Sequence, residues 1–178
     1  MIVFRNADVD VPFFWESDAQ PAGRWHEAGE GPAQYLETTP DAAWAEFLRH
    51  QEIHDPADLA GVERALWAVE IGDDEPASRP SLADHHLLGG PETYPACQDE
   101  ARRLRHDGAT RLVAPTAAVD STTASGWRTD SGLVPGGEQD EETIVLFGHW
   151  PMVTAWHACQ IGRPAASLLA RVRPLSTV

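Results

Sequence analysis

The sequence contains no lysine and only two cysteines, and each shortage excludes a class of protein. Cys97 and Cys159 are far apart and lack a CxxC spacing, so neither a disulfide framework nor a cysteine metal cluster is supported. All 13 basic residues are arginine, and 28 acidic residues leave a formal charge of -15. Such a field repels phosphodiester backbones, and no local basic patch opposes it. We therefore expect no direct binding of nucleic acid.

Several common functional motifs are missing as well. The chain has no GxxxxGK[ST], GxGxxG, HExxH or GxSxG pattern, which removes support for nucleoside triphosphatases, Rossmann dehydrogenases, zincins and the commonest serine hydrolases. Among the eight histidines only His85 with His86, and His50 with His54, are closely spaced, so no metal site is expected. There is no signal-peptide pattern and no apolar run of about 20 residues. We expect a cytoplasmic protein without a membrane segment.

What the sequence does contain favours one folded domain over residues 1–178. Its 42% apolar content supports a sizeable core, while 14 prolines and 14 glycines indicate many turns and short elements. Alternating and short apolar runs predict strands, and helical spacing predicts helices. We expect strands at 2–5, 33–38, 63–71, 109–115, 143–148 and 152–162, helices starting at 40 and 95 and over 164–172, and loops at 72–93 and 121–142. This pattern is typical of an α+β fold.

The helix that starts at Pro40 has the clearest signals. Thr39 is a good N-cap, and proline fits the first helical position. Ala43, Trp44, Phe47 and Leu48 share one face at helical spacing, which predicts that this face is buried. Glu46 lies at the margin of that face, on the same flank as His50, where a carboxylate can line a cleft. The late strands 143–148 and 152–162 are expected to pair with each other.

The stretch from Gln20 to His50 is rich in candidate functional side chains. Arg24 in "AGRWHEAGEGP" can form a bidentate bond to a phosphate or carboxylate, and the nearby glycines allow a ligand to approach closely. A structural interpretation remains open for each residue: Trp25 can anchor an ordinary loop, Tyr35 can lie half-buried in the core, and Glu46 can face solvent.

The order of these motifs along the chain resembles that of the RES domain family, which is named for an arginine, a glutamate and a serine. The ordered motifs are "VFR" with Arg5, "GRW" with Arg24 and Trp25, "YL" with Tyr35, "AWAEFLRH" with Glu46, and "LVAPTA" with Thr116. The resemblance extends from Arg5 to about Phe147 and is densest over 23–50. Thr116 stands where the family has its serine.

The resemblance implies an ADP-ribosyltransferase-like α+β fold, with two small, mainly antiparallel sheets around a cleft and flanking helices. It also implies an NAD-consuming enzyme that cleaves the nicotinamide–ribose bond, as a glycohydrolase or phosphorylase, with ADP-ribosyl transfer left open. Many RES proteins are toxins whose partner is an Xre-type, helix-turn-helix antitoxin. NAD would be the substrate, and no further cofactor is implied.

The resemblance implies roles for six residues. The catalytic group would be Glu46, Arg5 and Thr116, and the NAD-binding group would be Arg5, Arg24, Tyr35 and Trp25. A carboxylate such as Glu46 stabilises the positive charge that develops on ribose. Tyr35 could stack on nicotinamide, and the arginines offset the charge of the pyrophosphate. Asn6 and His26 lie beside the motif without an assigned role.

Three questions stay open from the sequence. Thr116 keeps a hydroxyl but adds a methyl group, which leaves a non-catalytic, nucleotide-binding or partner-binding member of the fold as an alternative. A pure protein-interaction module with an acidic surface is a second alternative. The apolar stretch "VPFFW" at 11–15 could also serve a homo-oligomer interface.

Overall fold

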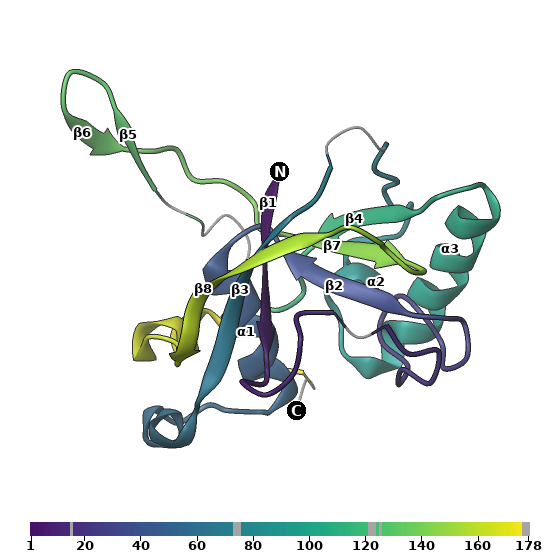
Figure 1. The fold of residues 1–178 in the computed structure, drawn as a ribbon, viewed down its shortest axis with the longest axis horizontal. Coiled ribbons are helices and arrows are strands. Elements are labelled where there is room, and N and C mark those ends of the chain that lie inside the picture. The colour runs from purple at the N-terminus through teal and green to yellow at the C-terminus, as the bar shows by residue number, and fades with distance from the viewer. Residues whose placement is uncertain (15, 73–75, 121–123, 125, 176–178) are drawn as a thin grey trace.

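The computed structural model describes residues 1–14, 16–72, 76–120, 124 and 126–175. Strands and helices are interspersed along the chain (Figure 1). The strands are β1 (Ile2–Ala7), β2 (Ala33–Glu37), β3 (Arg64–Glu70), β4 (Arg111–Pro115), β5 (Trp127–Thr129), β6 (Leu133–Pro135), β7 (Glu142–Phe147) and β8 (Thr154–Gly162). The helices are α1 (Pro40–His50), α2 (Asp84–Leu88) and α3 (Tyr94–His106), with short 3-10 turns η1 (Pro56–Gly61), η2 (Pro91–Thr93) and η3 (Ala166–Arg171). The α+β class predicted from the sequence is confirmed.

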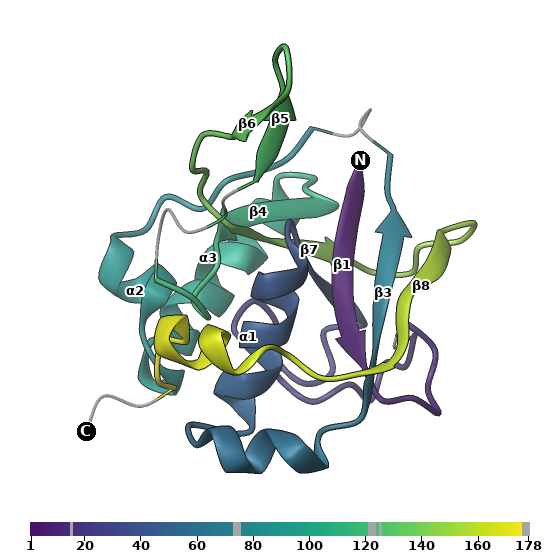
Figure 2. The same ribbon diagram turned by 90° about the vertical axis from the view of Figure 1, so that its left-hand side faces the viewer.

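The main sheet has six antiparallel strands in the order β4-β7-β2-β1-β3-β8. Its two halves join weakly at the centre, because β1 and β2 share a single register pair, Phe4 with Glu37. By contrast, β1 pairs with β3 along its whole length, and β2 does so with β7. In Figures 1 and 2 the strands of the β1-β3-β8 group cross the direction of the β4-β7-β2 group. The sheet thus consists of two small antiparallel groups that diverge from Glu37.

Three apolar clusters hold these layers together. One cluster lies where the two strand groups face each other, and it includes Val3, Leu36, Val69 and Ile144. The second packs α3 and α2 on the β4-β7-β2 group, and the third packs α1, η1 and η3 on the other side (Figure 2). The cleft described below opens beside α1, at the point where the first strand group meets the second.

Helix α1 forms as its sequence predicts. The Thr39 hydroxyl accepts a hydrogen bond from the Ala42 amide at 3.1 Å, a cap that is worth about 1 kcal/mol in typical helices. Thr39 also donates to the buried carboxylate of Glu141, which ties the start of α1 to the strand β7 region. The expected apolar face is buried at Ala43, Trp44 and Leu48. This anchoring fixes the direction in which Glu46 points.

Two segments expected to be loops contain regular structure. α2 and η2 lie within 72–93, and the hairpin β5-β6 lies within 121–142; residues 73–75, 121–123 and 125 are outside the described residues. These elements have five residues or fewer, which is too short for hydrophobic periodicity to appear. The hairpin turns at Ser131 and Gly132, both with positive φ, and projects from the body of the molecule (Figure 1).

The expected pairing of the two late strands is wrong. β7 lies between β4 and β2, whereas β8 pairs with β3 at the edge of the sheet. The reason is visible in the residues: β7 is mostly apolar and is buried except at Glu142, which suits an interior strand, while β8 is largely exposed. Within "VPFFW", Phe13 and Phe14 pack into the core cluster between the strand groups, and residue 15 is outside the described residues.

In the part of the chain that the structure describes, both cysteines are free, and no helix is long and apolar enough to cross a membrane.

Candidate active site

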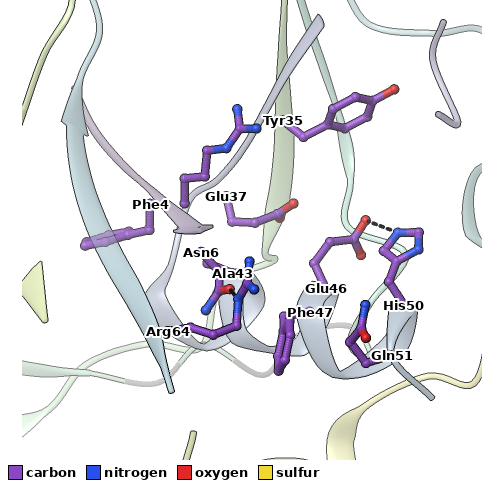
Figure 3. A pocket seen from close by; sticks show the side chains of 11 residues that line it. Phe4, Asn6, Tyr35, Glu37, Ala43, Glu46, Phe47, His50, Gln51 and Arg64 are labelled. Carbon is purple, nitrogen blue, oxygen red and sulfur yellow. Dashed lines mark hydrogen bonds and ion pairs between the residues drawn. The ribbon is translucent and has the colours of Figure 1, made fainter. Parts of the chain in front are cut away.

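A cleft of about 250 Å³ lies between the diverging strands β1 and β2 and the helix α1. Its wall carries several charged or polar side chains, namely Arg5, Tyr35, Glu37, Glu46, His50 and Arg64. Glu37 projects from β2 and Glu46 from α1 into the same space (Figure 3). A second hollow, lined by Gly23, Arg24 and Tyr94, shares Tyr35, Glu46 and His50 with the first. The two hollows therefore form one elongated site, with Glu46 at the place where they meet.

Arg5 brings a positive charge into this cleft from β1. Its Nη1 donates to Gln34 Oε1 at 2.6 Å, and the guanidinium lies 6.0 Å from the centre of the Phe14 ring. No carboxylate among the described residues forms an ion pair with it. Burial lowers the pKa of Arg5 to about 10, so the side chain remains charged at neutral pH. A partly buried cation without a carboxylate partner among the described residues is well suited to bind a phosphate or carboxylate of a ligand.

Glu46 forms an ion pair with His50, one turn further along α1. The distance from Glu46 Oε1 to His50 Nε2 is 3.2 Å (Figure 3). Burial favours the protonated form of Glu46, but the hydrogen bond and charge of His50, together with the charges of Arg49 and Arg24, outweigh it and keep the pKa of Glu46 below its usual range. The same hydrogen bond raises the pKa of His50. Glu46 Oε2 is buried and has no hydrogen-bond partner among the described residues, so this oxygen can accept a bond from a ligand.

The Tyr35 hydroxyl organises the loop beside the cleft. It accepts a hydrogen bond from the Trp25 amide at 2.9 Å and lies 2.9 Å from His26 Nδ1. Gly23 makes this possible, because a Cβ there would come within 2.6 Å of the hydroxyl. Burial raises the pKa of Tyr35, so its hydroxyl stays protonated. The Tyr35 ring is thereby held in the wall that the two hollows share.

Arg24 lies in the second hollow, but its guanidinium is held by the protein. Nη1 donates to the His86 carbonyl at 3.0 Å and to Thr93 Oγ1 at 3.2 Å, and Nη2 donates to the Gly89 carbonyl at 2.6 Å. The guanidinium also lies 4.8 Å from the centre of the Tyr94 ring. Arg24 therefore connects the loop before β2 to α2 and η2, and it contributes a fixed positive charge to the hollow.

The remaining two sequence candidates lie behind the cleft surface. Trp25 is only 2% exposed and packs in the core cluster under α3, where it anchors the loop. Thr116 is also buried, and its hydroxyl accepts from the Ala118 amide at 3.3 Å. The Thr116 side chain is close enough to Glu37 to lower the pKa of that carboxyl group, and it is connected to the cleft through it. The structure thus brings Arg5, Tyr35 and Glu46 together directly, and Thr116 indirectly.

Glu37 and Arg64 line the cleft but are not among the candidates from the sequence. Glu37 is the one whose position could have been predicted. A usable signal was present, because residues two apart in a strand share one face, so Tyr35 and Glu37 must point the same way. Of the two unassigned neighbours of the motif, Asn6 lines the cleft and His26 supports Tyr35. In the part of the chain that the structure describes, no group of three or more His, Cys, Asp or Glu side chains is arranged to hold a metal ion.

The fold as a whole is similar to that of a chain in a solved toxin–antitoxin complex. The likeness has a TM-score of 0.57 and covers 95% of this chain and 86% of the other. That chain belongs to the crystal structure of the M. tuberculosis MbcT-MbcA toxin-antitoxin complex, and its sequence is 13% identical. At this identity the comparison establishes a shared fold. No protein-family model matches the sequence, and a search of curated proteins finds no match.

Proposed function

We propose that this protein is an NAD-consuming enzyme of the RES type, which cleaves the bond between nicotinamide and ribose. The observation that carries the proposal is the convergence of Arg5, Tyr35 and Glu46 in one cleft. These three residues supply an anion-binding cation, an aromatic ring and an ionised carboxylate with a free, buried oxygen. An ADP-ribosyltransferase-like arrangement of two antiparallel strand groups around this cleft is consistent with the same proposal.

The chemistry assigns a distinct part to each residue. When the N-glycosidic bond breaks, its electron pair goes to the nicotinamide nitrogen and positive charge develops on the ribose. Glu46 stabilises that charge and orients the acceptor, whose oxygen bonds to the ribose carbon while its proton passes to a base or to solvent. Arg5 binds the diphosphate, and Arg24 adds fixed positive charge in the adjoining hollow. The Tyr35 ring offers a surface for the flat nicotinamide.

Purified protein tests this proposal most directly. Wild type should release nicotinamide from NAD, whereas Glu46→Gln should be slower by about a hundredfold or more, the usual effect of losing a main electrostatic group. Glu63→Gln is the matched control, because Glu63 is an exposed glutamate that lines neither hollow. Equal release by wild type and Glu46→Gln would contradict the proposal. Adding phosphate, or a protein acceptor, to the same assay identifies which group receives the ADP-ribose.

A toxin role with a protein antitoxin is the cellular form of this proposal. It is supported by the shared fold with a chain of a toxin–antitoxin complex and by the resemblance to RES proteins, whose partners are Xre-type helix-turn-helix proteins. Expression in bacteria should lower cellular NAD and arrest growth, and Glu46→Gln should do neither. Co-expression of a small reading frame that neighbours the gene should restore growth. Growth arrest by Glu46→Gln would contradict an NAD-dependent toxin.

A non-catalytic, nucleotide-binding protein is the second candidate, and Thr116 is the observation that favours it. Threonine replaces the serine of the family pattern and lies behind Glu37 rather than at the cleft surface. This candidate predicts that NAD raises the melting temperature of the protein without release of nicotinamide. A thermal shift accompanied by nicotinamide release rejects it, and the absence of both favours a protein-interaction module.

A further inference from the structure

Glu37 is a second carboxylate in the wall of the cleft, and its surroundings differ from those of Glu46. Glu37 is only 3% exposed. It lies in the single register pair that joins the two strand groups. Thr143 Oγ1 on β7 lies 2.9 Å from one carboxylate oxygen and 3.1 Å from the other. The Thr116 side chain, just after β4, is close enough to lower the pKa of Glu37. The Thr143 hydroxyl thus holds Glu37 in place while it faces the cleft (Figure 3).

The charges around the cleft give the two carboxylates opposite protonation states. Burial, and then the negative charge of Glu46, raise the pKa of Glu37 well above its usual range. The hydrogen bonds from Thr143 and Thr116 oppose this rise, and the charge of Glu141 adds to it. Glu46 is ionised beside His50, as described above.

The other charged groups in the cleft wall lie on neighbouring strands. Arg5 comes from β1 and Arg64 from β3, and both line the same space. Arg5 donates to Gln34, and Arg64 contacts Asn6 and Asp8, so neither forms an ion pair with Glu37 or Glu46 among the described residues. Two carboxyl groups whose surroundings drive their protonation apart are typical of acid and base pairs in enzyme sites.

The hydrogen-bond donors and acceptors of Glu37 and Glu46 indicate which chemical group fits between the two carboxyl groups. If Thr143 and Thr116 donate to Glu37, the proton of Glu37 needs an acceptor on the cleft side. Glu46 Oε2 is a buried acceptor without a partner among the described residues. A hydroxyl group can accept one hydrogen bond and donate another, so it complements both carboxyl groups at once.

We propose that Glu37, holding a proton, and Glu46, ionised, together bind one hydroxyl group, which accepts a hydrogen bond from Glu37 and donates one to Glu46. This inference rests on the proposed NAD-consuming function and adds a second carboxyl group to the site. The hydroxyl belongs either to the ribose of the substrate or to the acceptor water. Thr116 then acts through Glu37, because its hydroxyl orients that acid, and its extra methyl group lies behind the cleft surface.

Infrared spectroscopy tests the proton on Glu37 without any need for activity. At neutral pH the wild type should show the carbonyl band of a buried, protonated carboxyl group. Glu37→Gln should lose that band, and Glu63→Gln should keep it. The glutamine variant has nearly the same shape, and a urea unfolding curve checks that it is folded. A spectrum that is unchanged in folded Glu37→Gln would overturn the proposal.

The pH dependence of nicotinamide release tests the role of that proton. Wild-type activity should fall on the alkaline side as Glu37 ionises. Glu37→Gln still donates through its amide but has no proton to lose, so it should remain active and its alkaline fall should disappear. Glu37→Ala should lose at least about tenfold in activity, as expected for a hydrogen bond to a charged network. His50 also titrates beside Glu46, so an alkaline fall that persists in Glu37→Gln belongs to His50 and overturns the proposal.

The kinetic constants of Glu37→Ala distinguish the two sources of the hydroxyl. A higher KM for NAD with unchanged kcat assigns the hydroxyl to the ribose of the substrate, and a lower kcat with unchanged KM assigns it to the acceptor. Unchanged values of both constants overturn the proposal.

A wild type that releases no nicotinamide refutes the proposed function, but it leaves the bound hydroxyl testable. In that case the affinity for NAD itself is measured by calorimetry. Glu37→Ala should bind NAD at least about tenfold more weakly than wild type. Equal affinities would overturn the bridging of a ribose hydroxyl, the form of the proposal that applies to a protein that binds but does not cleave NAD.

Discussion

The cleft between β1 and α1 and the loop at residues 20–26 lie side by side, yet their polar groups differ in how many hydrogen-bond partners they have. In the loop, Arg24 donates to three acceptors and the Tyr35 hydroxyl contacts both the Trp25 amide and the His26 ring. In the cleft, Arg5 has one hydrogen bond and no described carboxylate as a partner, and Glu46 Oε2 has no described partner.

This difference separates the groups that stabilise the fold from the groups available to a ligand. Hydrogen-bonded polar groups such as Arg24 and the Tyr35 hydroxyl make the loop rigid, and removing one partner leaves the others unsatisfied at a cost. Buried charges without partners lower stability, so a protein keeps them where a ligand can complete them. Substitutions in the loop should therefore change stability, and substitutions in the cleft should change binding.

Arg24→Met should produce the largest loss of stability. The change leaves the His86 carbonyl and Thr93 without this donor, and we expect the free energy of unfolding to fall by about 3 kcal/mol. Urea denaturation measures this. Arg128→Met is the matched control, because Arg128 is exposed on the β5-β6 hairpin and should change stability by less than about 0.5 kcal/mol. Equal stability of the two variants would contradict the conclusion that the bonded groups of the loop stabilise the fold.

Arg5→Met should have the reverse profile. It removes a desolvated charge and one hydrogen bond, so the free energy of unfolding should change by less than about 1 kcal/mol. Affinity for NAD should weaken by at least about tenfold, because a charge-assisted bond to the diphosphate is lost. Calorimetric titration of NAD into wild type and Arg5→Met measures this. A stable Arg5→Met that binds NAD as tightly as wild type does would remove Arg5 from the site.

Tyr35→Phe tests the boundary between the two regions. The ring stays in the cleft wall, but the Trp25 amide loses its acceptor, so the free energy of unfolding should fall by about 1.5 kcal/mol. The KM for NAD should stay within about twofold, since the apolar ring still packs against the ligand. Thermal or urea unfolding gives the first quantity and steady-state kinetics the second. A large increase in KM at unchanged stability would instead place the hydroxyl in contact with substrate.

The sequence predicted the parts of this site that depend on local pattern. The cap at Thr39 and the helical phase of Glu46 follow from spacing along the chain, and both agree with the structure. The meeting of β1 and β2 at Glu37 depends on pairing between distant strands, which spacing along one strand does not specify. The same reason explains why the predicted pairing of β7 and β8 is wrong.

The use of each arginine could not be predicted from its residue type. The resemblance implies a phosphate-binding role for both Arg5 and Arg24, because either guanidinium can bind a phosphate. What separates them is the set of acceptors nearby, and those acceptors come from α2 and η2, two short elements that had no sequence signal. The position of Glu37, in contrast, could have been predicted, because strand alternation places it on the same face as Tyr35.

His50→Gln should have the smallest effect, and the size of this effect depends on pH. The ordinary pKa values of Glu46 and His50 are 4.5 and 6.5, and in the folded protein the first is lowered and the second raised. The contribution of Glu46 is therefore present above pH 4.5 and lost as the pH falls through its lowered value. The contribution of His50 is present below pH 6.5 and lost as the pH rises through its raised value.

The ion pair thus stabilises the fold most between pH 4.5 and 6.5. Because the His50 side chain is 46% exposed and the Glu46 side chain 29% exposed, solvent screens the pair. The variant should then be less stable than wild type by only about 0.5 kcal/mol in that window. Urea unfolding of both proteins at about pH 5.5 and about pH 9 measures the difference, which should vanish at the higher value. A larger difference at the higher pH would mean that neutral His50 stabilises the fold by packing, and the cleft would then resemble the loop in this respect.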